Sequence, residues 1–171
     1  MFDYLKEVVR LLKGAQPSLW VSPWIQIDYG ATSGALDAND AFGNPFTFSV
    51  DVLGNPLPIL GQILELDVLD IDDDTLAITV HVLTDFFTAA ASDAAFTLGL
   101  ADAELYVTSQ TFAAGLDVGS FKHHEILEIN KRYYSPKHTL VCQASTTGVP
   151  NIASAGTMPK VRAVVLPLAW G

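Results

Sequence analysis

The feature that most constrains the fold is a series of short runs, from residue 46 onward, that alternate between apolar and polar residues. Alternation with a period of two indicates strands with one buried face, because successive side chains of a strand point to opposite faces. The runs span residues 46–52, 63–71, 75–84, 103–113, 123–134, 139–144 and 160–168. Turn-rich connections separate them without an intervening helix. This pattern predicts an all-β protein, an antiparallel β-sandwich of the jelly-roll type.

Two of these runs predict which side chains face the core. In residues 75–84 the residues expected to face inward are Leu76, Ile78, Val80 and Val82, opposite Thr75, Thr79 and His81. In residues 63–71 the expected inward residues are Leu64, Leu66 and Val68, with Glu65 and Asp67 on the opposite, polar face.

The first 44 residues lack this alternation. Residues 2–13 carry apolar residues at helical spacing, and Gly14 and Pro17 then end the pattern, which predicts a short amphipathic helix. Residues 17–44 combine turn-forming residues with large apolar ones and predict an extended arm. The expected organisation is therefore a helix and arm over residues 1–44, followed by a sandwich domain over residues 45–171.

The arm requires a surface to cover its apolar side chains, because an exposed flexible linker with two tryptophans would be poorly soluble. We expect either that it docks on a partner or that it folds back as an extra edge strand of its own sandwich. A second candidate contact is the basic and aromatic run at residues 131–134, since Tyr and Arg are enriched at binding hot spots. The candidate contact residues are Trp20, Trp24, Ile27, Tyr29, Arg132 and Tyr133.

Composition limits the partners. The chain has 9 basic and 19 acidic residues, a net charge of -10, which disfavours binding to nucleic acid or to an anionic membrane surface. No apolar run approaches the roughly 18 residues of a membrane span. Only 16% of the residues are charged and 50% are hydrophobic, so part of the apolar surface is expected to be covered by a partner or by further copies of the chain.

No residue pattern indicates catalysis or a cofactor. Cys142 is the only cysteine and lies in an apolar run, which is typical of a buried structural thiol. The aspartates of residues 70–74 are spaced like the start of a calcium loop, but the glycine and glutamate that the motif needs are absent. His123 and His124 are neighbours on a predicted strand and would point to opposite faces. We therefore predict no metal, no cofactor and no enzyme activity; a carboxylate pair of a sugar-cleaving sandwich is the weaker option.

The order of elements from residue 62 to residue 170 resembles the small jelly-roll capsid cement (decoration) proteins of tailed bacteriophages. The resemblance is carried by the sequence SDAAF at residues 92–96, KRYY at residues 131–134 before a strand, and GT at residues 156–157 before the last strand. It implies a structural protein without a cofactor or catalytic residues. Such a protein is made in the host cytoplasm and bound, as a dimer or trimer, to the major capsid protein on the virion exterior.

An alternative function on the same fold is a carbohydrate- or receptor-binding module of a phage tail, because a fold alone does not decide function. Sugar binding would require Trp20, Trp24 and Trp170 to line one shallow groove.

Overall fold

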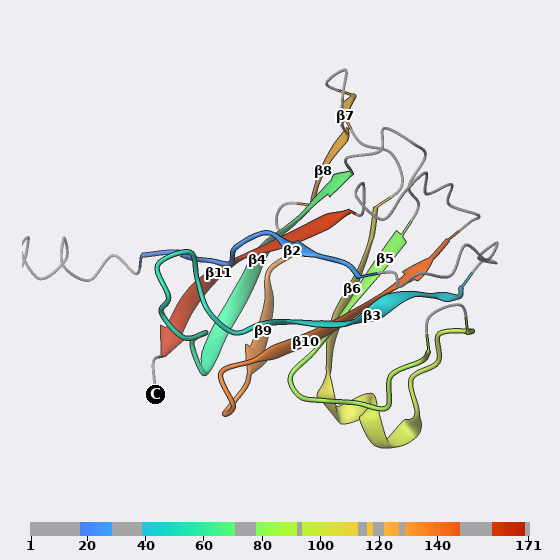
Figure 1. The fold of residues 1–171 in the computed structure, drawn as a ribbon. Helices are drawn as coiled ribbons and strands as arrows, with labels where there is room; N and C mark the ends of the chain where they lie inside the picture. Colours follow the sequence, from blue (N-terminus) through green and yellow to red (C-terminus); the bar gives the residue numbers. More distant parts are fainter. Residues whose placement is uncertain are drawn as a thin grey trace, which may run out of the picture.

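The computed structural model describes residues 18–28, 39–70, 78–91, 94–112, 116–117, 122–126, 129–147 and 159–169. These residues form two antiparallel sheets, which confirms the predicted all-β sandwich (Figure 1). The predicted helix over residues 2–13 lies outside the described residues. Within the described part of the chain, no helix is long and apolar enough to span a membrane.

The larger sheet has seven strands in the order β1-β11-β4-β8-β7, with β2 paired to β11 and β9 paired to β4. All of its pairs are antiparallel. The strands are β1 (Trp20–Val21), β2 (Ile25–Gln26), β4 (Leu60–Asp70), β7 (Leu116–Asp117), β8 (Lys122–Ile126), β9 (Lys131–Tyr134) and β11 (Lys160–Ala169).

The smaller sheet has four strands in the order β3-β10-β5-β6. They are β3 (Ala41–Phe48), β5 (Ile78–Leu83), β6 (Tyr106–Phe112) and β10 (Leu140–Thr146). A 3₁₀ helix, η1 (Leu100–Leu105), precedes β6 and lies below the sheet in Figure 1. The expected strand over residues 103–113 therefore begins only at Tyr106.

The core lies between the two sheets and contains the predicted inward face of β5. Ile78, Val80 and Val82 are fully buried, as the alternation predicts, and Leu76 lies outside the described residues. From the opposite sheet, Leu66 and Val68 of β4 are also fully buried. The two faces pack as one continuous apolar cluster.

The described part of the arm belongs to the sandwich itself. β1 and β2 both pair with β11, with Trp20 opposite Val165 and Ile25 opposite Val161. The backbone amide of Ile27 continues this edge by donating to the carbonyl of Pro159 at 2.9 Å. Of the two alternatives for the arm, residues 18–28 therefore follow the one in which the chain folds back on its own sheet. The division expected at residue 44 falls inside β3.

The predicted register of β4 is wrong at Leu64. The pairing with β11 passes from Glu65 opposite Val164 to Ile63 opposite Val165, so Leu64 is skipped at a bulge. Ile63 consequently occupies the core in its place, and Leu64 is only half-buried. A local bulge leaves no trace in the apolar-polar pattern, because both residues are aliphatic.

Candidate partner-binding surface

The six candidate contact residues do not lie together. Trp20, Ile27 and Tyr133 are buried in the core of the chain itself, because β1, β2 and β9 complete the larger sheet. A partner would find no surface of these three side chains to contact. Trp24 is half-buried, Arg132 is exposed, and Tyr29 lies outside the described residues. The burial of Trp20 also prevents the tryptophan-lined sugar groove.

Trp24 covers an ion pair on the outer face of the larger sheet. The guanidinium of Arg162 lies 4.6 Å from the centre of the Trp24 ring, a cation–π contact. Arg162 donates from Nε at 2.9 Å, and also from Nη2, to the Oδ2 atom of Asp67, which lies directly opposite it in the pairing of β4 with β11. Asp67, expected on a solvated polar face, is 0% exposed. The sequence pattern predicts that the Asp67 carboxylate is exposed to solvent, but Arg162 lies beside it on the sheet, Trp24 covers Arg162, and the carboxylate is buried.

Replacing Arg162 with methionine is expected to lower the free energy of unfolding by about 3–5 kcal/mol, because it leaves the Asp67 carboxylate buried without its counter-charge. No other group would compensate the charge of Asp67 in this variant, because the Oδ1 atom of Asp67 accepts no hydrogen bond within the described residues. Urea denaturation measures the loss. The double variant Asp67→Asn/Arg162→Met is the control and is expected to recover at least half of it; equal losses in both variants would contradict this account.

A cleft lies at the basic and aromatic run on β9. It has a volume of about 490 Å³ and lies between β9 and the end of η1; its lining includes Glu104, Tyr106, Arg132, Tyr134 and Pro136. Tyr134 is 61% exposed and was not predicted, whereas the predicted Tyr133 is buried. Successive residues of a strand face opposite ways, so Arg132 and Tyr134 share one face while Tyr133 packs inward.

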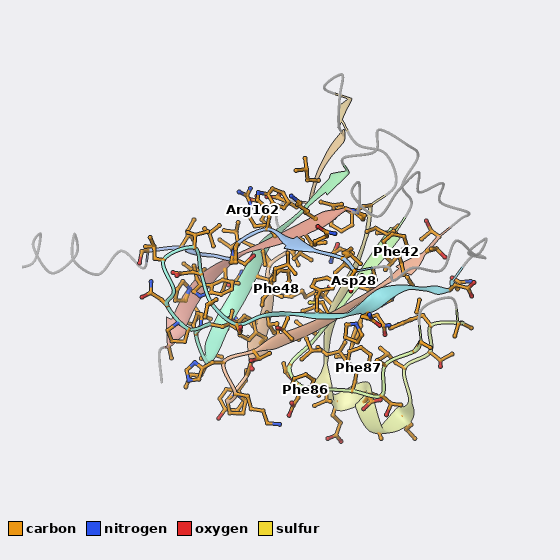
Figure 2. The ribbon with its side chains drawn as sticks, viewed as in Figure 1. Asp28, Phe42, Phe48, Phe86, Phe87 and Arg162 are labelled. Carbon is orange, nitrogen blue, oxygen red and sulfur yellow. The ribbon has the colours of Figure 1, made fainter. Side chains whose placement is uncertain are left out.

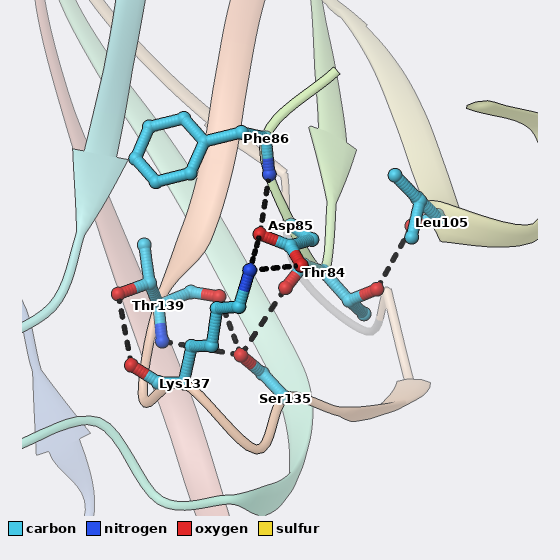
Figure 3. Close-up of polar contacts among 7 residues, drawn as sticks. All are labelled: Thr84, Asp85, Phe86, Leu105, Ser135, Lys137 and Thr139. Atoms are coloured by element: carbon cyan, nitrogen blue, oxygen red, sulfur yellow. Dashed lines mark hydrogen bonds and ion pairs between the residues drawn. The ribbon is translucent and has the colours of Figure 1, made fainter.

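Polar contacts hold the two walls of this cleft together (Figure 3). Lys137 Nζ lies 2.7 Å from Asp85 Oδ2 and joins the turn after β9 to the segment after β5. The Ser135 hydroxyl donates to the carbonyl of Thr84 at 3.3 Å, and the amide of Thr84 donates to the carbonyl of Leu105 at 2.9 Å. The cleft is therefore a fixed part of the sandwich.

The second surface feature is an apolar groove on the outer face of the smaller sheet. It has a volume of about 610 Å³, and its lining includes His81, Phe96, Leu98, Leu100, Ala103 and Tyr106. Leu100 is 93% exposed. Sequence reasoning missed this groove because residues 85–105 show no strand period. The apolar residues of this segment could have indicated that it packs on the sheet.

Two contacts fix the segment that forms one wall of the groove. The ring of Phe96 stacks on that of His81 with centroids 4.0 Å apart. The side chain of Gln143, buried in β10, donates to the carbonyl of Ala90 at 2.7 Å and to that of Gly43 at 3.1 Å. In Figure 2, Phe86 and Phe87 lie on the same segment, ahead of η1. The groove is thus preformed.

Burial lowers the pKa of His81 to about 4, below its ordinary value of 6.5. The folded state therefore binds fewer protons than the unfolded state between these two pH values, and stability falls as the pH drops from about 6.5 to about 4. We expect the melting temperature of the wild type to fall across this window and that of His81→Gln to change much less. The hydrogen bond from Lys137 lowers the pKa of Asp85 below 3.8, so its contribution is lost only at lower pH. Parallel pH profiles of the two proteins would contradict the assignment.

The described residues contain no group of three His, Cys, Asp or Glu side chains that could hold a metal ion. Cys142 is fully buried, and burial raises the pKa of its thiol, which disfavours the nucleophilic thiolate. The aspartates at 72 and 74 lie outside the described residues, and nothing is described of the side chains of Asp70, His123 and His124.

No protein-family model matches the chain, and no curated protein matches it.

Proposed function

We propose that this chain is a capsid decoration protein, a structural component of a phage virion that binds the outer surface of the major capsid protein lattice and stabilises the particle. In this proposal the sandwich has the jelly-roll connection and residues 2–13 form a short helix. The observation that carries the proposal is the exposed face of β9, where Arg132 and Tyr134 line a cleft in an otherwise acidic chain.

The chemistry of this face fits a protein surface. Arg and Tyr combine apolar contact area with hydrogen-bonding groups and are over-represented among residues that dominate binding energy. Tyr134 is exposed, and neither Arg132 nor its neighbour Lys131 forms an ion pair within the described residues. In a chain with a net charge of -10, the Arg132 guanidinium on this face would favour an acidic group of a partner, although the cleft lining also contains Asp85 and Glu104.

The test uses phage particles assembled without this chain, to which the purified protein is added before sedimentation. We expect the wild type to sediment with the particles and to raise the temperature at which they release their DNA. Arg132→Ala/Tyr134→Ala is expected to bind at least tenfold more weakly, whereas Gln26→Ala, which alters an exposed residue of β2, binds normally. A wild-type protein that stays in the supernatant would refute the function. Equal binding by the double variant would refute the role of this face.

A further inference from the structure

The loop between β3 and β4 presents an apolar projection, here called the tip and made of Val50, Val52 and Leu53. Leu53 is 83% exposed, and Val52 and Val50 are also exposed. Leu19, exposed beside the tip, lines with Leu53 one side of a hollow of about 390 Å³ between the tip and β1. Large apolar side chains that converge at one projecting loop indicate an interaction site.

The tip is held in one conformation. The Asp51 carboxylate accepts the backbone amides of Leu53 and Asn55, both at 2.8 Å, and the side-chain amide of Asn55 at 2.9 Å. Gly54 takes the left-handed conformation with a φ of +86°, which closes the turn. The amide of Val52 donates to the carbonyl of Val21 at 3.0 Å and anchors the loop to β1. A fixed loop loses little conformational entropy when it binds.

The tip and the groove match in shape and in charge. The tip is convex, and its one carboxylate is engaged within the loop. The groove is concave, and its lining, which includes Phe96, Leu98, Leu100 and Tyr106, contains no acidic or basic residue other than the partly buried His81. A charged segment would therefore find no counter-charge in the groove lining. An uncharged apolar loop fits it.

The two features cannot meet within one molecule. The tip rests on β1 at the edge of the larger sheet, whereas the groove lies on the outer face of β5 and β6 beside η1. Figure 1 shows the loop between β3 and β4 and the helix η1 well apart. Each copy thus carries one projection and one groove, both open to solvent.

We propose that the chain associates with itself head to tail, with the tip of one copy inserted in the groove of the next. Such a contact joins two different surfaces, so it generates an open filament or a closed ring, of which a two-fold pair with two reciprocal contacts is the smallest. The proposal does not depend on the capsid function.

The test is sedimentation velocity of the purified full chain over a range of concentrations. The wild type is expected to form oligomers, and Leu53→Asp and Leu100→Asp are each expected to remain monomeric. An equimolar mixture of the two variants is the decisive sample: Leu53→Asp keeps an intact groove and Leu100→Asp an intact tip. The mixture is therefore expected to form a one-to-one dimer and nothing larger.

Both substitutions are at exposed positions and are expected to keep the wild-type melting temperature. If either variant unfolds, Leu53→Ser and Leu100→Ser replace them in the same mixing experiment. A wild type that stays monomeric up to its solubility limit would overturn the proposal and leave the groove to a different partner. A mixture that stays monomeric would also overturn it. Particle binding is measured separately, so failure here does not count against the decoration function.

Discussion

Deleting residues 1–44 is expected to leave a chain that does not fold. The deletion removes β1, β2 and the first half of β3, and with them the buried side chains of Trp20, Ile27 and Phe42. Loss of one large buried aromatic side chain costs about 3–5 kcal/mol, and a whole domain is stable by only about 5–15 kcal/mol. The missing strands also leave the edge of β11 unpaired on that side.

Circular dichroism and thermal denaturation of the truncated chain test this expectation. A point variant separates the effect of burial from that of strand loss: Trp20→Ala is expected to lower the free energy of unfolding by about 3–5 kcal/mol. Leu19→Ala, at the neighbouring half-exposed position, is expected to change it by less than about 1 kcal/mol. A truncated chain with a cooperative, native-like transition would show that the arm is dispensable for the sandwich and would favour docking on a partner.

The strands of the sandwich could be predicted wherever apolar and polar residues alternate along the chain. Val80 and Val82 of β5 were predicted as core residues from this alternation alone, although Thr79 on the opposite face is also buried. β1 and β2 have two residues each, too few to show a period, and their partner β11 lies about 140 residues further along the chain. Their pairing depends on tertiary contacts that local patterns do not contain.

The candidate surface was predicted only in part, for related reasons. Residues 131–134 were predicted as a contact with Arg132 and Tyr133 as its side chains, but without the strand register the sequence does not show that Tyr134 is the exposed tyrosine. Tyr133 instead packs against Gly61, where an added Cβ would lie 2.6 Å from its hydroxyl. The groove depends on residues 85–91 and 94–105 lying over β5, and Gln143 holds this segment at Ala90, which lies 53 residues before it in the chain. No spacing within the segment encodes that contact.

Val80→Asp is expected to abolish folding. Val80 is 0% exposed and lies within the apolar cluster between the two sheets, on a strand paired on both sides. A carboxylate at this position would be buried without an ion-pair partner, and the transfer of an unpaired charge out of water costs several kcal/mol even after the structure relaxes. That loss is comparable to the whole stability of a domain of this size.

The matched control is the same substitution at an exposed site, Val52→Asp, where the side chain is 63% exposed on the tip. This variant is expected to melt within a few degrees of the wild type, because the new carboxylate stays hydrated. Thermal denaturation at low protein concentration compares the two without interference from self-association. A native transition in Val80→Asp would mean that the side chain at 80 reaches water. The inward register of β5, and with it the position of His81 at the groove, would then be wrong.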